Sequence, residues 1–197
     1  YNYGGPVRSV SQLCESLVRL GVEVTVVTTN ANGNKILDIP TSELIDVAGV
    51  KVFYYPVKNI RPRSYFYSPE LAKACLHKIE EFDLVVLETF YTHSVRPTVI
   101  ACKRNNVPYI FSLRGQLLPW ALQHKGWKKR LYLSFVGRRY LNNASAIHCA
   151  ALAEAQALSQ LGITSPTFVV PNGIDFATWR NLPLDGNLRQ HLDIPGN

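Results

Sequence analysis

Apolar residues recur at helical and then strand spacing in the first thirty positions of the chain. Residues 7–20 place Val, Leu and Cys three and four apart, and Gly21 follows where such a helix would end. The stretch 23–29 is then rich in β-branched residues, which favour strands. The pattern therefore predicts a helix followed by a buried strand.

The same alternation continues to residue 170. Ser68 and Pro69 supply an N-cap and a first-turn proline to a helix that should run to about Phe82. Further strands are expected at 50–55, 84–87, 109–113, 146–149 and 167–170, and further helices at 97–105, 127–142 and 152–161. Short apolar strands between helices are typical of a parallel sheet covered on both faces. The predicted fold class is α/β, a doubly wound parallel sheet of the Rossmann-like type.

The two ends of the chain depart from this alternation. At the N-terminal end, Gly4 and Gly5 lie at the start of a helix, where a doubly wound domain would begin with a strand. After Pro171 the strand and helix pattern stops, and proline and glycine recur. We expect residues 1–180 to form a Rossmann-like domain that lacks its first strand. Residues 181–197 are expected to be a linker toward a further domain.

Composition indicates an ordinary globular protein. Of 197 residues, 47% are hydrophobic and 18% charged, which fits one well-buried domain. No apolar run approaches the roughly 18 residues of a membrane span, and the first residues given lack the charged and apolar regions of a signal peptide. The four cysteines are far apart, sit in apolar stretches and show no metal-binding spacing: Cys14, Cys75, Cys102 and Cys149. These features predict a cytoplasmic protein with reduced cysteines and no metal site.

Charge is distributed unevenly along the chain. From Thr89 through Ala153 there is no Asp or Glu, whereas ten Lys and Arg residues lie there, although the whole chain carries only +7. Such a segment favours an anionic partner, which can be phosphate, a lipid surface or nucleic acid. No recognised nucleic-acid-binding motif accompanies the basic residues, so nucleic acid is the least favoured of the three.

The basic segment also contains an amphipathic stretch. Between residues 117 and 140, aromatic and aliphatic residues such as Trp120, Trp127 and Phe135 alternate with clusters of Lys and Arg. One interpretation is that this stretch lies on an anionic membrane. The other is that the apolar residues pack on the sheet and the basic residues face solvent.

The glycine pair at the start of the chain can bind phosphate. Gly4 and Gly5 leave backbone N–H groups bare at the positive end of the first helix, although two glycines can also serve only a tight turn. A dinucleotide-binding dehydrogenase is excluded because its GxGxxG loop is replaced by GGPVRS. Its ribose-binding acid is also missing, since the next strand ends in Thr28, Thr29 and Asn30.

Four segments resemble retaining family 4 glycosyltransferases in order and spacing. GGPVRSVSQLCESLVRLGVEVTVVTT resembles their opening glycine loop, helix and second strand, and DLVVLETFYTHSVRP their fourth-strand region. VPYIFSLRGQLLPWALQHKGWKK is similar to a segment that the family usually writes with His-Gly and Pro-Trp-Ala-Leu, and FVVPNGIDFATW to its Pro-Asn-Gly-Ile-Asp signature. The resemblance covers nearly the whole chain.

The resemblance implies the N-terminal, acceptor-side half of a two-domain GT-B enzyme. Such an enzyme moves a sugar, as a hexosyltransferase-type activity, from a nucleotide-sugar to a glycan or lipid-linked acceptor, with retention and without a metal or other cofactor. Relatives commonly build envelope or exported polysaccharides, so the inner face of the plasma membrane is an expected location. The family's paired-glutamate donor motif does not occur here, so this chain alone is expected to be inactive. A non-catalytic α/β module that binds an anionic ligand, a membrane surface or nucleic acid is the alternative.

The resemblance also suggests candidate site residues. Those expected to act in catalysis are Glu88, His93 and Arg114; those expected near the diphosphate or the sugars are Gly4, Gly5, Arg8, Thr89 and Gly115; those expected at the hinge or cleft are Asn172, Gly173 and Asp175.

Arg114 is the clearest departure from the family pattern, because it stands where a histidine usually precedes the glycine. Arginine cannot act as a base, but it can hold a carboxylate or phosphate through two parallel hydrogen bonds. Either Arg114 recognises an anionic group, or it turns away and the site is partly disabled. Glu88, on what should be a neighbouring strand, is the competing partner, and His93 is a candidate for the missing imidazole.

Overall fold

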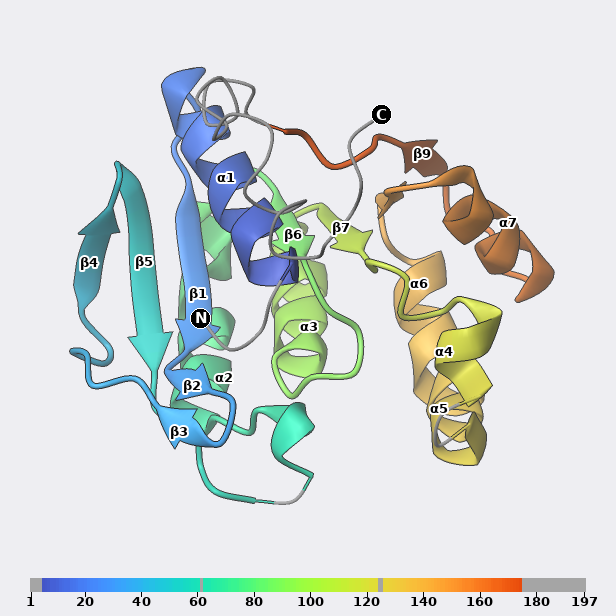
Figure 1. Cartoon of the computed structure of the whole chain (residues 1–197), viewed down its shortest axis with the longest axis horizontal. Helices are drawn as coiled ribbons and strands as arrows, with labels where there is room; N and C mark the ends of the chain where they lie inside the picture. Colours follow the sequence, from blue (N-terminus) through green and yellow to red (C-terminus); the bar gives the residue numbers. More distant parts are fainter. Residues whose placement is uncertain (1–4, 61, 124–125, 175–197) are drawn as a thin grey trace, which may run out of the picture.

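Parallel strands alternate with helices through most of the chain (Figure 1). A computed structural model describes residues 5–60, 62–123 and 126–174. The strands are β1 (Thr25–Thr29), β2 (Ala31–Asn32), β3 (Lys35–Ile36), β4 (Leu44–Val47), β5 (Val50–Tyr55), β6 (Val85–Leu87), β7 (Tyr109–Ser112), β8 (Ala146–Cys149) and β9 (Thr167–Val169). The helices are α1 (Gly5–Arg19), α2 (Pro69–Lys78), α3 (Val95–Asn105), α4 (Pro119–Gln123), α5 (Gly126–Tyr132), α6 (Arg138–Asn142) and α7 (Leu152–Gln160). Short 3₁₀ turns lie at Arg63–Tyr65 (η1) and Ile79–Glu81 (η2), and a π-turn, η3, at Leu133–Gly137.

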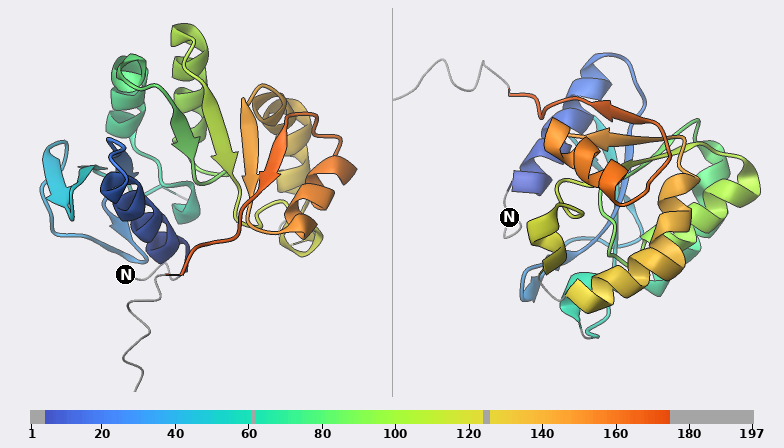
Figure 2. Two further views of the ribbon diagram at one scale, coloured as in Figure 1. Left: turned by 90° about the horizontal axis from the view of Figure 1, so that it is seen from above. Right: turned by 90° about the vertical axis from the view of Figure 1, so that its right-hand side faces the viewer.

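The strands form a parallel arrangement, as the sequence predicts. β6, β7, β8 and β9 follow one another in a fully parallel sheet, and β1 pairs in parallel with β5. Figure 2 shows α2 and α3 on one side of the strands and α1 on the other. The α/β class with a parallel sheet is therefore confirmed.

In the described part of the chain the parallel strands are divided between two sheets. There, β1 pairs with β5 alone and β6 with β7 alone, so two sheets stand side by side without a strand that bonds to both. α1 connects them, because its Ser9 contacts the end of β7 and its Val18 lies against Gly49 beside β5. Buried side chains make the connection on the opposite side, in a core that joins Tyr55 of β5 to α2, α3 and the second sheet.

A hairpin that the sequence did not reveal completes the first sheet. β4 runs antiparallel to β5 through a turn at Ala48 and Gly49, both at positive φ, and the Gly49 amide donates to Asp46 Oδ1 over 3.0 Å. Two-residue turns of this kind normally carry Asn-Gly or Asp-Gly. The Ala48-Gly49 pair gives no clear sequence signal for this turn, because alanine seldom adopts positive φ.

The cap of α2 follows the prediction closely. Ser68 precedes the helix in extended conformation, and its Oγ accepts from the Leu71 amide over 3.2 Å while Pro69 fills the first turn. The Ser68 side chain is fully buried. The predicted helix 127–142 is also present, as α5, the π-turn and α6 in succession.

The π-turn coincides with a tight contact. A methyl group at Gly137 would lie 2.5 Å from Cζ of Phe90, whose ring is fully buried and meets the rings of Phe111 and Tyr132 edge to face. Only glycine lets the helix approach the core this closely.

We predict that Gly137→Ala lowers the free energy of unfolding by about 1–3 kcal/mol, because the added methyl group overpacks the Phe90 site. Chemical denaturation provides the measurement. Gly126→Ala, nearby in α5, is the matched control, since a methyl group there has no neighbour within 4 Å and should be neutral or slightly stabilising. Equal stability of the two variants would contradict this account of the packing.

Candidate functional site

The guanidinium of Arg114 joins four segments at the carboxyl edge of the parallel strands. Its Nε donates to Glu88 Oε2, just past β6, over 2.6 Å. Its Nη1 donates to Ser9 Oγ of α1 over 3.0 Å and to Asn172 Oδ1, beyond β9, over 2.9 Å. The Arg114 side chain is only 9% exposed and that of Glu88 23%. Charge-assisted hydrogen bonds in so dry a place are strong and directional.

The turn that carries Arg114 is conformationally unusual. Arg114 has φ 45° and Gly115 φ 77°, and the turn is closed by a bond from the Gln116 amide to the Leu113 carbonyl. The Gln116 side chain in turn accepts from the Phe90 amide over 2.9 Å. A non-glycine residue at positive φ costs energy and is kept where surrounding contacts fix it, often at functional sites.

Leu118, Trp120 and Glu154 lie next to Gly115, and the sequence did not mark any of the three as a site residue. A methyl group at Gly115 would lie 3.3 Å from Leu118 Cδ1, 3.8 Å from Glu154 Oε1 and 3.9 Å from Cζ2 of Trp120. The other Glu154 oxygen accepts from the Ala150 amide over 3.0 Å, which fixes the carboxylate in the first turn of α7. Trp120 is 68% exposed. The only sequence signal for Glu154 was that it is the first acid after the basic segment.

A serine and a histidine on adjacent strands fasten the segment that leads to Asn172. His148 Nε2 lies 2.7 Å from the Val170 carbonyl, which can only accept, so Nε2 carries the proton. Nδ1 therefore accepts from the Ser112 hydroxyl over 3.1 Å. Ser112 is only 1% exposed, so the pair is a structural link and not an accessible nucleophile.

The glycine loop residues are only partly described. Gly4 lies outside the described residues, and Gly5 opens α1, where it is exposed and has open space beside it. Arg8 is exposed on the same helix, whereas Ser9, which the sequence did not single out, holds Arg114. The start of α1 thus lies beside the end of β7, as expected for a site at this edge.

Thr89 and His93 belong to the loop after β6. Thr89 Oγ1 is 2.8 Å from Thr92 Oγ1 within that loop. His93 Nδ1 accepts from the Ser68 amide over 3.3 Å, and its ring packs edge-on against Tyr65 and Tyr67. These contacts hold the segment before α2, so within the described residues His93 is not brought to the Arg114 cluster.

The structure changes the setting expected for Arg114. In the sequence, no acid lies in the same segment as Arg114. In the structure, Arg114 pairs with Glu88 from the neighbouring strand, which was the alternative to an external anion. Recognition of an external anion stays a prediction, and such an anion would have to compete with Glu88. Asn172 joins the cluster, Gly173 is exposed, and Asp175 lies outside the described residues.

The cysteines are free thiols that pack in the protein. Cys75, Cys102 and Cys149 are buried, and burial raises the pKa of Cys102 and of Cys149 to about 11. Across residues 5–60, 62–123 and 126–174, no three His, Cys, Asp or Glu side chains form a group that could hold a metal ion.

We predict that His93 makes the protein less stable in mild acid. Burial lowers the pKa of His93 below its ordinary 6.5, so on acidification the unfolded chain binds this proton first. Stability should therefore decline as pH falls from 6.5 toward the lower folded-state pKa. His93→Asn keeps a side-chain acceptor but cannot take a proton, so its unfolding midpoint should change less over this range. A parallel decline in both proteins would exclude His93 as the cause.

Comparison with known proteins is informative at the level of family and fold. The family model "Glycosyl transferase 4-like domain" matches residues 4–173. None of the curated proteins matches the sequence. The crystal structure of Anabaena Alr3699/HepE in complex with UDP-glucose has a TM-score of 0.55 and 19% identity over 88% of this chain and 50% of that chain. The same protein in complex with UDP and glucose gives 0.53 and 18% over 86% and 50%.

The similarity to these two structures, at 18–19% sequence identity, shows a shared fold. The chain spans about half the length of those structures. The family match covers far more than half of this sequence. The chain therefore belongs to the glycosyl transferase 4-like domain family.

Proposed function

We propose that this chain is the acceptor-side half of a GT-B glycosyltransferase that moves a hexose from a nucleotide-sugar to a glycan or lipid-linked acceptor, with retention of the anomeric configuration. The family match supports the reaction class, and the structural relatives are described as complexes with UDP-glucose or with UDP and glucose. The observation that carries the proposal is the Arg114 cluster at the carboxyl edge of the strands, where α/β proteins bind their ligands.

The acceptor sugar binds, on this proposal, in the space beside Gly115. Glu154 Oε1 faces that space and accepts hydrogen bonds from sugar hydroxyl groups, while the exposed indole of Trp120 offers a flat apolar face to the C–H groups of a pyranose ring. Glu88, which accepts from Arg114 Nε, is the proposed catalytic carboxylate. Arg114 is a positioning residue, because two of its nitrogens are already bonded to protein groups.

The donor is held, on the same proposal, mainly by a further domain, with residues 181–197 as the linker toward it. Gly5 and Arg8 would meet the donor diphosphate at the positive end of α1. We expect the missing first strand of the domain to lie between β1 and β6, which do not pair with each other. Leu13 of α1, Val27 of β1 and Val86 of β6 are 44%, 39% and 49% exposed and would be covered by it.

The whole enzyme is proposed to work in the cytoplasm, in the synthesis of envelope or exported polysaccharide. No cofactor is invoked beyond the nucleotide-sugar itself.

The competing function, a non-catalytic binding module for an anionic ligand, is favoured by one observation: an arginine stands where the family usually has histidine. A ligand-binding experiment distinguishes the glycosyltransferase domain from the binding module.

We predict that the 197-residue chain binds simple sugars weakly, in the millimolar range, and binds nucleotide-sugars no better. Saturation-transfer NMR with a panel of mono- and disaccharides, and calorimetry with UDP- and GDP-sugars, provide the measurements. No transfer is expected, because most donor contacts belong to the other domain. Micromolar binding of a nucleotide-sugar by this chain would mean that the donor half has been misassigned.

Two exposed tryptophans provide the matched comparison for the sugar site. Trp120→Ala should abolish the saturation-transfer signals, whereas Trp127→Ala, which removes an equally exposed indole, should leave them unchanged. Binding of inorganic phosphate without any sugar signal would support the binding module instead.

A further inference from the structure

The helical run α5–η3 exposes a row of large apolar side chains. Trp127 is 70% exposed, Leu131 52% and Phe135 77%, and their spacing of four residues places them along one side of the helix. This apolar row does not take part in the core. The sheet side of the same helical run is occupied by Leu133, Gly137 and Leu141, which are buried. The interpretation that all apolar residues here pack on the sheet is therefore wrong for the apolar row.

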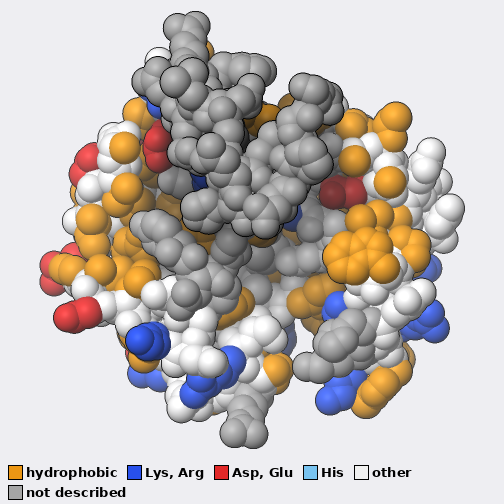
Figure 3. Space-filling model, in the orientation of Figure 1, with side chains coloured by type: hydrophobic (Ala, Val, Ile, Leu, Met, Phe, Trp, Pro, Cys, Tyr) orange, Lys and Arg blue, Asp and Glu red, His pale blue; other side chains and the backbone are white. Residues whose placement is uncertain are grey.

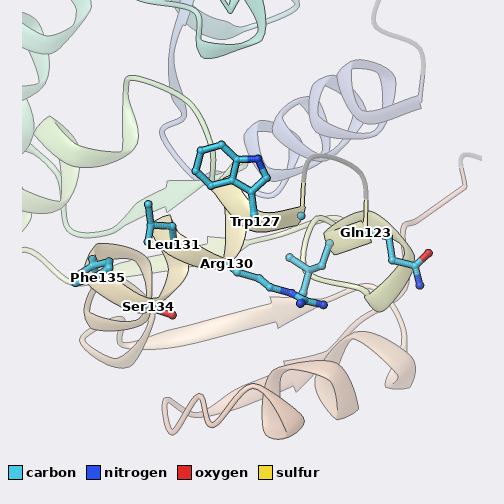
Figure 4. A pocket seen from close by; sticks show the side chains of 8 residues that line it. Gln123, Trp127, Arg130, Leu131, Ser134 and Phe135 are labelled. Atoms are coloured by element: carbon cyan, nitrogen blue, oxygen red, sulfur yellow. The ribbon is translucent and has the colours of Figure 1, made fainter.

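A shallow hollow of about 670 Å³ runs along the apolar row between α4 and α5. Figure 4 shows Trp127 and Leu131 projecting from the same side of the helix and Arg130 reaching across toward Gln123. The residues that line the hollow include none of the Arg114 cluster. The hollow is therefore separate from the Arg114 cluster.

Basic side chains flank the apolar row. Lys128 and Arg130 are exposed and, within the described part of the chain, pair with no carboxylate, whereas Lys129 turns inward over the Tyr91 ring. We call Lys128 and Arg130 the basic flank. Hydrophobic and basic side chains gather over α4 and α5 in the lower right of Figure 3. Acids cannot neutralise this surface from its own segment, because none occurs between Thr89 and Ala153.

We propose that the apolar row and the basic flank form a docking surface for an anionic lipid bilayer. The row enters the boundary between headgroups and acyl chains, and the basic flank contacts lipid phosphates, which is how interfacial helices bind membranes. Among the described helices, none has the length and hydropathy to cross a bilayer. Binding is therefore peripheral, in the plane of the surface.

The distribution of charge favours a lipid bilayer, and not a second copy of this chain, as the partner of this surface. Two copies joined through the apolar row would bring like-charged basic flanks together, which costs energy, whereas an anionic bilayer offers negative charge and apolar volume together. Large exposed apolar side chains of this kind mark interaction sites on soluble proteins.

This docking surface extends the proposed function. It rests on that function only for the role of the membrane, which is to present a lipid-linked acceptor. α4 carries Trp120 beside Gly115 and packs against α5, so a bilayer beneath α5 would present a lipid-linked acceptor near the proposed sugar site. Vesicle binding is measured without any sugar transfer. Failure of membrane docking and failure of the glycosyltransferase proposal are thus distinguishable.

The test is sedimentation of the 197-residue chain with vesicles of phosphatidylglycerol and phosphatidylcholine in equal parts, compared with phosphatidylcholine alone. We expect binding only to the anionic vesicles, weakened by added salt. Trp127→Ser with Phe135→Ser should abolish it, and Lys128→Ala with Arg130→Ala should weaken it roughly five-fold per residue. With Trp120→Phe and Trp179→Phe in place, Trp127 fluorescence should shift to the blue and be quenched by brominated lipid.

Matched variants elsewhere on the surface provide the controls. Leu20→Ser with Ile36→Ser removes exposed apolar residues, and Lys103→Ala with Arg104→Ala removes two exposed basic residues; both should bind like the unaltered chain. Circular dichroism confirms that each variant is folded. The proposal is overturned if anionic vesicles are not bound, or if the control variants lose binding equally. It is also overturned if the serine variants instead abolish a dimer seen by light scattering without lipid.

Discussion

The ion pair between Arg114 and Glu88 is the interaction on which the carboxyl edge of this domain depends. Removing two charged groups from water is costly, and the cost is offset only when the remaining hydrogen-bonding groups are also satisfied. Two further bonds, from Arg114 Nη1 to Ser9 and Asn172, contribute to this compensation. Because these partners come from α1 and from the segment after β9, one side chain fixes segments that the strands alone do not bond together.

The features around the pair are consistent with this role. The positive φ of Arg114 is retained at some cost, and the turn leaves Gly115 without a side chain beside Glu154 and Trp120. His148 fastens Val170, two residues before Asn172, so the last partner of Arg114 is itself held in place. The Arg114 cluster is thus organised by polar contacts, whereas the exposed surface of α5 is apolar and basic. The proposed sugar site and the proposed lipid surface would together suit an acceptor carried on a lipid.

Periodicity was sufficient to predict most of the helices and parallel strands, because their apolar faces meet one core. It could not predict which side chains meet across strands. Glu88 and Arg114 are 26 residues apart, and only the pairing of β6 with β7 makes them neighbours. The Ser112 and His148 link depends in the same way on strand register. The separation into two sheets was also missed, since alternation of elements along a sequence does not show which strands share hydrogen bonds.

A double-mutant cycle on Glu88 and Arg114 tests the central claim most directly. Glu88→Gln, Arg114→Met and the double variant would be compared by chemical denaturation. The account predicts that each single change is destabilising and that the double variant loses less than the sum, with a coupling of about 1–3 kcal/mol between the two side chains. Additive losses, within about 0.5 kcal/mol, would show that the pair does not organise this edge and would contradict the account.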